Sequence, residues 1–381
     1  GGDIELVVLD FADAFFQFPV NADELKYMVT TAGGAFYVFN RAAQGSRGAP
    51  LLCGRSLALV MRLASSLVPG SSARQALYVD DPIFILAGTQ PERDRSLAKI
   101  VGAILALNFK LAFEKAQTAT TGETLTWTSA TYTITQDGVT VKVKEDIVTE
   151  VEAAITAMRA TNKISKKDLR KLAGQTSCIA SLLYTWRPFV AMLWAPLYDP
   201  KAAAHDTPNL VWHSAIRIPL AWMQAFLEGK FNDLERHYGI QDYLDEGVDT
   251  EITVDASPEA LGGTLTEDGG ITEYFMDDLC EFDEQVLGHR RGGSDGQQAW
   301  EALAVLCALR LWSSKWGHKR VRLRVRSDSV TALTLLLKLK ATGSGPALIA
   351  REAALDIAEA LYTPSVLAHI PGVANVAADF L

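Results

Sequence analysis

Residues Leu77–Leu86 read Leu-Tyr-Val-Asp-Asp-Pro-Ile-Phe-Ile-Leu, and this stretch decides the fold of the first part of the chain. Two adjacent carboxylates stand between two apolar, β-prone runs, which predicts a tight turn between two strands. Adjacent acids repel each other unless a cation lies beside them. An earlier apolar run also ends at an aspartate, Asp10, and Asp13 follows three positions later. Aspartates at strand ends are suited to hold Mg²⁺ against phosphate groups, so the pattern predicts a phosphoryl-transfer site.

The length and composition of the chain suit a globular protein of two to three packed domains. Of its 381 residues, 49% are hydrophobic, which is ample for packed cores. The four cysteines form no Cys-x-x-Cys pair, so they predict no zinc site or disulfide framework and indicate a reducing, intracellular compartment. No apolar run reaches the roughly 18 residues that a membrane span needs, and the start has no signal-peptide pattern. Because the chain begins Gly1-Gly2 close to a predicted strand, we expect a segment cut from a longer protein.

The charge of the chain argues weakly against a nucleic-acid partner. Its formal net charge is −9, whereas proteins that bind phosphate backbones usually present basic surfaces. Much of the excess lies in Glu267–Glu284, which carries eight acids and no Lys or Arg. Such a run is typical of a solvated loop or sheet edge. The distribution of charge therefore matters more than its sum.

Apolar periodicity predicts three regions along the chain. Residues 1–145 alternate strands and helices and indicate an α+β domain, whereas residues 146–248 read as amphipathic helices punctuated by prolines. Residues 249–381 again alternate strands and helices and predict a separate α/β domain with a mixed sheet. We expect strands near Leu6–Asp10, Ala35–Phe39, Ala76–Val79, Ile83–Leu86, Leu125–Trp127, Thr131–Ile134, Thr140–Val143, Ile252–Asp255, Gly262–Gly263, Ile271–Phe275, Val321–Ser327 and Val366–Ile370. We expect helices near Pro50–Leu67, Pro91–Leu107, Lys144–Arg159, Lys166–Leu183, Trp212–Leu227, Gln297–Lys315, Ser329–Leu339 and Pro346–Tyr362.

Three short motifs of the first region resemble those of retroelement reverse transcriptases. Asp10–Gln17 is similar to the family's first catalytic motif, and Gln44–Pro50 to its second, which contacts template and nucleotide. Tyr78–Asp81 is similar to its signature third motif. The resemblance implies a polymerase palm, an antiparallel sheet with helices, in which the fingers are largely missing. It implies that residues 146–248 are the helical thumb and connection.

The same resemblance implies roles for single residues of the palm. Asp10, Asp80 and Asp81 would hold two Mg²⁺ ions, with Mn²⁺ as an alternative, and Lys115 would lie near the leaving pyrophosphate. The substrate-binding set would be Phe15, at an aromatic gate that favours deoxynucleotides, with Gln44, Gly45 and Tyr78. Taken singly, these residues have ordinary alternatives. A phenylalanine is commonly a core residue, a lysine a surface residue, and a glycine-rich segment a loop before a helix.

Four carboxylates of the last region resemble the active site of ribonuclease H. Asp255 and Asp328 end predicted strands, Glu301 lies within a predicted helix, and Asp379 stands near the end of the chain. The resemblance implies an RNase H-like mixed sheet with helices, whose four acids bind two Mg²⁺ ions and cut the RNA strand of an RNA:DNA hybrid. His369 falls where the family has a mobile histidine that assists product release. A lone histidine is otherwise more often structural.

For two groups of basic residues, the sequence does not determine what they bind. Lys163, Lys166, Lys167, Arg170 and Lys171 could follow a duplex backbone or form a solvated helix face. Arg320, Arg322, Arg324 and Arg326 alternate with apolar residues. They could meet a hybrid, or they could form an exposed strand face that balances the acidic segment Glu267–Glu284.

The leading hypothesis is an RNA-directed DNA polymerase with an associated RNase H, from a retrotransposon polyprotein. Its partners would be an RNA or DNA template with primer, an RNA:DNA hybrid, deoxynucleoside triphosphates and the rest of the polyprotein, with no membrane. It would work in a cytoplasmic particle, in the nucleus, or in both. One alternative is an inactive or domesticated relic that only binds nucleic acid, which the missing fingers, the acidic charge and Pro82 after the acidic pair favour. Another is a nuclease that acts without polymerisation.

Overall fold

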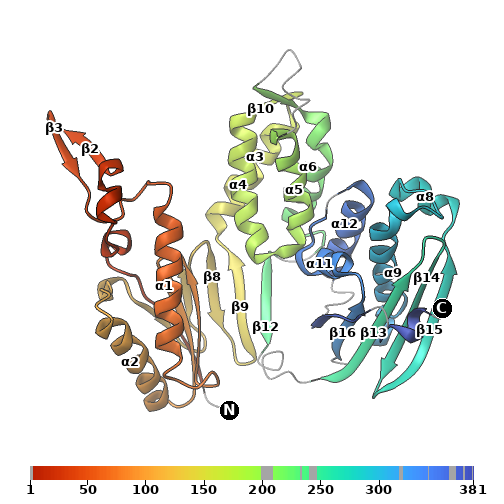
Figure 1. The fold of residues 1–381 in the computed structure, drawn as a ribbon, viewed down its shortest axis with the longest axis horizontal. Coiled ribbons are helices and arrows are strands. Elements are labelled where there is room, and N and C mark those ends of the chain that lie inside the picture. The colour runs from red at the N-terminus through yellow and green to blue at the C-terminus, as the bar shows by residue number, and fades with distance from the viewer. Residues whose placement is uncertain are drawn as a thin grey trace. The chain divides into compact units, whose positions relative to one another are not determined.

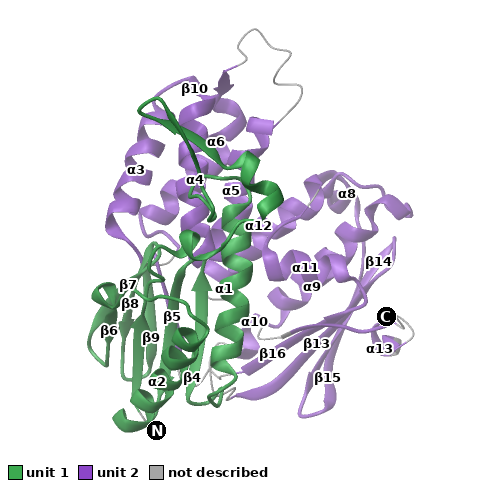
Figure 2. Ribbon diagram, turned by 60° about the vertical axis from the view of Figure 1, so that its left-hand side comes forward, with its two compact units in different colours: residues 1–142 green, residues 143–381 purple. Residues whose placement is uncertain are grey.

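The computed structural model describes residues 3–198, 209–231, 234–239, 247–316, 321–341, 343–359, 366–371, 374–379 and 381. The course of the chain is shown in Figure 1. It divides into two compact units, residues 1–142 and 143–381 (Figure 2). In the described ranges no helix is both long enough and apolar enough to cross a bilayer. The predicted fold class, several domains that mix antiparallel sheets, helical segments and a mixed sheet, is confirmed.

Unit 1 is built on an antiparallel sheet of four strands in the order β4-β5-β1-β6. These are β4 (Ala73–Tyr78), β5 (Asp81–Ala87), β1 (Ile4–Val8) and β6 (Gln117–Ala119). Period-two alternation divides the side chains between the faces. Val7 and Phe84 join a core with the helices α1 (Ala49–Ser65) and α2 (Gln90–Ala106). Leu6 and Val8 join a smaller core with β7 (Thr124–Trp127) and β8 (Ala130–Ile134), next to which lies β9 (Gly138–Val143).

A hairpin of β2 (Val29–Ala32) and β3 (Ala35–Val38) projects solvent-exposed side chains on both faces. Its turn residues Gly33 and Gly34 both have positive φ, at 58° and 80°. Only β3 was predicted from the sequence. The Gly-Gly pair between two short β-prone runs is the signal that would have found β2.

The remaining described elements of unit 1 are short 3-10 turns. They are η1 (Ala14–Gln17), η2 (Ala22–Tyr27) and η3 (Phe113–Lys115). The turn η1 lies within the first predicted catalytic motif, and η3 ends at Lys115.

Unit 2 begins with a group of helices. These are α3 (Glu145–Arg159), α4 (Lys166–Leu182), α5 (Arg187–Tyr198) and α6 (His213–Leu227), with η4 (Tyr184–Trp186) and the strands β10 (Lys163–Ser165), β11 (Leu210–Trp212) and β12 (Glu235–Gly239). The sequence pattern does not predict α5, because Pro188 and Pro196 are usual helix breakers. Pro188 lies in the first turn, where no backbone donor is needed, and burial of Phe189 and Leu193 supports the helix.

The rest of unit 2 is a mixed five-stranded sheet with helices, in the strand order β15-β14-β13-β16-β17. Its strands are β13 (Val248–Ala256), β14 (Ala260–Glu267), β15 (Gly270–Asp278), β16 (Val321–Ser327) and β17 (Val366–His369). Its helices are α8 (Glu281–Leu287), α9 (Gln297–Leu311), α10 (Ser313–Trp316), α11 (Val330–Lys338), α12 (Ser344–Ala358) and α13 (Val376–Asp379), with the 3-10 turn η6 (Ser294–Gly296) before α9. The strands β13, β16 and β17 run parallel, whereas β14 and β15 are antiparallel to their neighbours.

Two predictions in this sheet region need adjustment. The helix expected over 297–315 breaks at Trp312, because the indole is buried and its Nε1 donates to Glu273 (2.9 Å). The helix expected to reach Tyr362 is described only as far as Ala358, and residues 360–365 lie outside the described ranges. The acidic run Glu267–Glu284 includes β15, an edge strand with mostly exposed side chains, as predicted for a loop or edge.

The helices and the mixed sheet of unit 2 share one hydrophobic core. It extends from Trp186 and Phe189 of the helical part to Trp300 and Leu336 of the sheet part. The helix α12 packs against α9 and also against α5 and η4. The described residues of 143–381 therefore form a single compact unit, and the boundary at 248/249 stays a prediction.

Candidate functional site

The first predicted site lies where β1 ends beside the β4–β5 turn. The Leu9 amide donates to the carbonyl oxygen of Pro82 (3.1 Å), and the Phe11 amide donates to that of Asp80 (3.4 Å). Asp10 stands between these two residues. The antiparallel register of β1 and β5 thus brings the backbone of Asp10 to the acidic pair, as the sequence predicted.

The turn that carries the acidic pair is strained. Tyr78 and Asp81 face each other across β4 and β5, so Val79 and Asp80 form a two-residue turn. Val79 has a φ of 57°, a conformation in which glycine is usual and a β-branched residue is an outlier. Such strain is typical of functional sites, where it holds a side chain in a defined direction.

The acids of this turn are electrostatically coupled. Burial raises the pKa of Asp80, and the charge of Asp10 raises it further. Burial also raises the pKa of Asp81, with added contributions from the charges of Asp80 and Asp10. The charge of Lys115 acts in the opposite direction on both. These carboxylates would therefore gain from a cation placed among them.

Lys115 pairs with Asp10 through a hydrogen-bonded ion pair between Nζ and Oδ2. The preceding segment is attached to the first motif by its backbone. The Ala12 amide donates to the carbonyl oxygen of Lys110 (3.0 Å), and the Ala112 amide donates to that of Asp10 (2.8 Å). These bonds hold the segment that leads to Lys115 beside the first motif. Lys115 therefore reaches Asp10, although the two residues are 105 positions apart in the sequence.

Gln17 strengthens this attachment, and sequence reasoning gave it no role of its own. Its Nε2 donates to the carbonyl oxygens of Ala12 (2.5 Å) and Lys110 (3.0 Å), and its Oε1 accepts from the Lys110 amide (2.8 Å). The Gln17 side-chain amide therefore bonds both backbone groups of Lys110 and so joins the two segments. Its place at the end of the first motif was the available signal.

The predicted substrate-binding residues lie on different segments of unit 1. Phe15 lies in η1 and is half-buried against the core that Val7 and Phe84 form with α1 and α2. Gln44 and Gly45 lie in an exposed loop before α1, where Gly45 has a φ of 93° and open space around its Cα. Tyr78 ends β4 and is 61% exposed. Their roles toward a nucleotide stay predictions.

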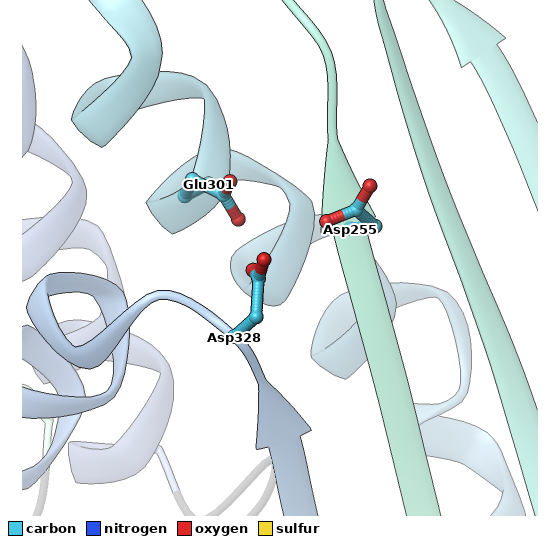
Figure 3. A group of neighbouring side chains, drawn as sticks. All are labelled: Asp255, Glu301 and Asp328. Carbon is cyan, nitrogen blue, oxygen red and sulfur yellow. The ribbon is translucent and has the colours of Figure 1, made fainter. Parts of the chain in front are cut away.

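The second predicted site is a compact cluster of three carboxylates. Asp255 lies at the end of β13, Glu301 within α9, and Asp328 directly after β16. One ligand oxygen from each lies within 4.8 Å of the others, and Figure 3 shows the three side chains pointing toward one another. In the described part of the chain, Asp10, Asp80 and Asp81 do not come together this closely.

The parallel pairing of β13 and β16 explains the cluster. Their carboxyl ends meet at the same edge of the sheet, next to the point where β14 reverses direction. Ligands of mixed sheets commonly bind at such an edge. The helix α9 packs against β13 and contributes Glu301 to the cluster. Residues 46 and 73 positions from Asp255 thus converge by sheet pairing and helix packing.

The surroundings of the cluster suit a hard cation. Asp328 Oδ1 is buried and accepts no hydrogen bond from the described residues. Gln297 Nε2 donates to Glu301 Oε1 (3.0 Å) and to the carbonyl oxygen of Ala256 (2.5 Å), so it orients Glu301 toward the end of β13. Three carboxylates this close repel one another unless a cation neutralises them. Oxygen-only donors are those that Mg²⁺ and Mn²⁺ prefer.

The two other predicted residues of this site are placed less fully. His369 ends β17, pairs with Ser327 in the sheet, and has an exposed side chain, so its backbone lies beside the segment that carries Asp328. Asp379 ends α13, which packs against β13 and β14. The side chain of Asp379 lies outside the described residues.

The two basic groups behave differently. On β16, Arg322 pairs with Asp249, while Arg324 and Arg326 pair with Glu251. These arginines balance acids of the neighbouring strand β13, and Arg320 lies outside the described residues. In the basic cluster near α4, Lys171 lies 3.8 Å from Glu150, and Lys163 lies over the Trp212 ring at 4.7 Å.

Comparisons with known proteins gave matches among solved structures. No protein-family model and no curated protein matches this sequence. The foamy viral protease–reverse transcriptase dRH in complex with double-stranded DNA matches with a TM-score of 0.47 and 18% identity, over 96% of this chain and 56% of the other. The foamy viral protease–reverse transcriptase with an RNA/DNA hybrid matches with a TM-score of 0.47 and 16% identity, over 97% of this chain and 44% of the other. The same protein with double-stranded DNA gives a TM-score of 0.43 and 17% identity, over 97% and 68%. This chain thus spans about half the length of the first two structures that it resembles.

Proposed function

We propose that this chain is the palm, helical connector and nuclease part of an RNA-directed DNA polymerase that also degrades RNA in RNA:DNA hybrids. The observation that carries the nuclease is the convergence of Asp255, Glu301 and Asp328 within 4.8 Å. The polymerase rests on the coupled acids Asp10 and Asp80 with the paired Lys115. The chain would act within a retrotransposon polyprotein, in a cytoplasmic particle, the nucleus, or both.

The residues of the nuclease site have distinct tasks in this proposal. Asp255, Glu301 and Asp328, with Asp379, would hold two Mg²⁺ ions, which when bound activate water and stabilise the leaving oxygen. Gln297 fixes the direction of Glu301 through the hydrogen bond already described. The parallel strands hold Asp255 and Asp328 at fixed separation, so little rearrangement is needed when the hybrid binds.

In the palm, Asp10, Asp80 and Asp81 would hold two Mg²⁺ ions, whose charge neutralises the triphosphate. Lys115 neutralises Asp10 in the absence of substrate. It can exchange that partner for a phosphate oxygen, because its side chain is exposed. The substrates would be a primed RNA or DNA template and deoxynucleoside triphosphates.

Hybrid cleavage tests the nuclease. With Mg²⁺ and a labelled RNA:DNA hybrid, Asp255→Asn and Asp328→Asn should each strongly reduce the rate of cleavage. Replacing a residue that only orients a metal ligand typically reduces activity about 10- to 100-fold, and the loss here should be larger. Asp268→Asn makes the same chemical change in the exposed β14–β15 turn, where a φ of 50° suits asparagine, and should cleave normally. Cleavage that persists in Asp255→Asn would reject the site.

Primer extension on an RNA template tests the polymerase. Asp80→Asn should abolish Mg²⁺-dependent extension, and Asp23→Asn, on the exposed turn η2, should leave it unchanged. Equal extension by wild type and Asp80→Asn would contradict the assignment.

A nuclease without polymerase activity is the second candidate. It is favoured by the observation that the Asp255 cluster meets the 4.8 Å spacing and the palm acids do not. Hybrid cleavage without primer extension would establish it. Absence of both activities, with retained nucleic-acid binding, would instead support the relic hypothesis.

A further inference from the structure

A cleft of about 1300 Å³ lies within unit 2, remote in sequence from the palm motifs. One wall is formed by α4 and α5, and the other by α11, α12 and the segment that joins them. Helix α5 lines it with Ala191, Ala195 and Tyr198. The first residue of α11, Val330, also lines it and stands two residues after Asp328. The cleft therefore adjoins the helix that follows the nuclease cluster.

The charged residues that line this cleft are all cationic. They are Arg187, Lys338, Lys340 and Arg351, and no Asp or Glu is among the lining residues. This distribution is notable in a chain with a net charge of −9. A concave surface with charges of one sign concentrates ligands of the opposite sign. The ligand that suits this surface is an anion.

The cations of the cleft lack carboxylate partners among the described residues. Arg351 Nε is buried and donates to no described atom, and one of its terminal nitrogens donates to the Met192 sulfur (3.6 Å). Arg187 donates to the carbonyl oxygens of Ala180 (3.3 Å) and Lys338 (3.5 Å). A guanidinium so placed retains donors that phosphate oxygens satisfy well.

An aromatic pair gives the cleft a second feature. The rings of Trp194 and Tyr198 stack on α5, with centroids 6.0 Å apart and planes 21° apart. Trp194 is held by a hydrogen bond from Nε1 to Ser177 Oγ (3.1 Å), whereas Tyr198 is 70% exposed. Exposed rings beside cations bind single-stranded nucleic acid, because unpaired bases stack on the rings while cations follow the phosphates. Bases within a duplex are not available for such stacking.

We propose that this cleft binds a single-stranded polynucleotide, with phosphates at Lys338, Lys340, Arg187 and Arg351 and a base stacked on Tyr198. This inference rests on the proposed function. Where one strand of a hybrid continues beyond its partner, the unpaired part would bind in this cleft. Its nearness in sequence to Asp328 suits a strand that enters or leaves the nuclease cluster. An acidic peptide would use the cations but would not need the aromatic pair.

Fluorescence anisotropy of a labelled 12-nucleotide single-stranded RNA, in EDTA, tests the proposal with the whole chain. The double variant Lys338→Ala/Lys340→Ala should weaken binding about 10-fold at low salt and reduce the salt slope by about 1.4, or about 0.7 for each phosphate contact. Tyr198→Ala should weaken binding about 5-fold or more, and Tyr198→Phe should restore it. The double variant Arg217→Ala/Lys230→Ala removes the same charge from exposed positions outside the cleft and should bind normally.

Three results would overturn the proposal. They are wild-type affinity in both cleft variants, an equal loss of affinity for a blunt hybrid, and competition by polyglutamate as strong as that by unlabelled RNA. Cleavage of a blunt hybrid by the cleft variants should match the wild type. If no variant or wild type cleaves but the cleft variants still lose RNA binding, the nuclease proposal fails and the cleft stands. Normal cleavage with unchanged binding rejects only the cleft.

Discussion

Asp80 occupies a position that suits a metal ligand and disfavours the unliganded fold. It follows Val79, whose positive φ is strained, and its charge is held near Asp10 in a partly buried turn. Both features cost stability. Active sites commonly accept such a cost, so that substitutions which abolish activity can stabilise the protein.

Asp80→Asn should therefore raise the melting temperature in the absence of divalent cations. The raised pKa of Asp80 means that its stabilising contribution is present at low pH, below the unfolded-state value, and is lost as pH rises through the folded value. The difference between variant and wild type should grow as pH rises above 3.8, the ordinary pKa of an aspartate, and through the higher folded pKa of Asp80. Thermal unfolding across this range measures it, with Asp23→Asn as the neutral control. A lower melting temperature for Asp80→Asn at every pH would contradict the prediction.

Two glycines of β14 show how one strand serves both packing and the nuclease site. A Cβ at Gly263 would lie 2.5 Å from Phe275 Cε1 and 3.1 Å from Val254 Cγ1, between side chains of the sheet. A Cβ at Gly262 would instead lie 2.9 Å from the Leu381 Cβ and 3.3 Å from the Ala378 carbonyl oxygen. Substitution at Gly262 thus acts on α13, which ends at Asp379.

Gly262→Ala should reduce hybrid cleavage with little loss of stability, because the short terminal helix can shift. Gly263→Ala should lose about 1–3 kcal/mol of unfolding free energy, because overpacking there strains the sheet. Urea unfolding and hybrid cleavage measured on both variants separate the two effects. Gly174→Ala, with open space around an exposed helical position, is the control for glycine replacement. Full cleavage by Gly262→Ala would show that α13 does not need its present position.

At the scale of the whole molecule, unit 2 should behave as one folding unit. The segment 143–381 produced alone should cleave a hybrid, because its described core is internal to it. The segment 249–381 should unfold at a lower temperature, because it leaves α12 without α5 and η4 and uncovers apolar surface. Calorimetry of the two segments checks this. Equal melting temperatures would show that the sheet part is stable without the helices.

The amino-acid sequence determined the features that depend on local pattern. The strands around Asp10, Asp80 and Asp255 and most of the long helices follow from apolar periodicity, and the acids at strand ends follow from their place in the motifs. Local pattern failed where tertiary burial overrode a local signal, as in α5, where Pro188 is tolerated in the first turn and burial of Phe189 and Leu193 supports the helix although Pro196 lies inside it. The break at Trp312 has a similar cause, because a long-range hydrogen bond to Glu273 fixes the indole.

Only the tertiary structure decided which distant groups meet. Parallel pairing of β13 with β16 brings Asp255 to Asp328, and the packing of α9 adds Glu301, so the 4.8 Å cluster is a property of register and packing. The Gln17 attachment and the cationic cleft likewise join residues from different parts of the chain. Periodicity reports which way one segment faces, whereas contact between segments depends on how their buried faces fit together. That fit is settled by the folded core as a whole.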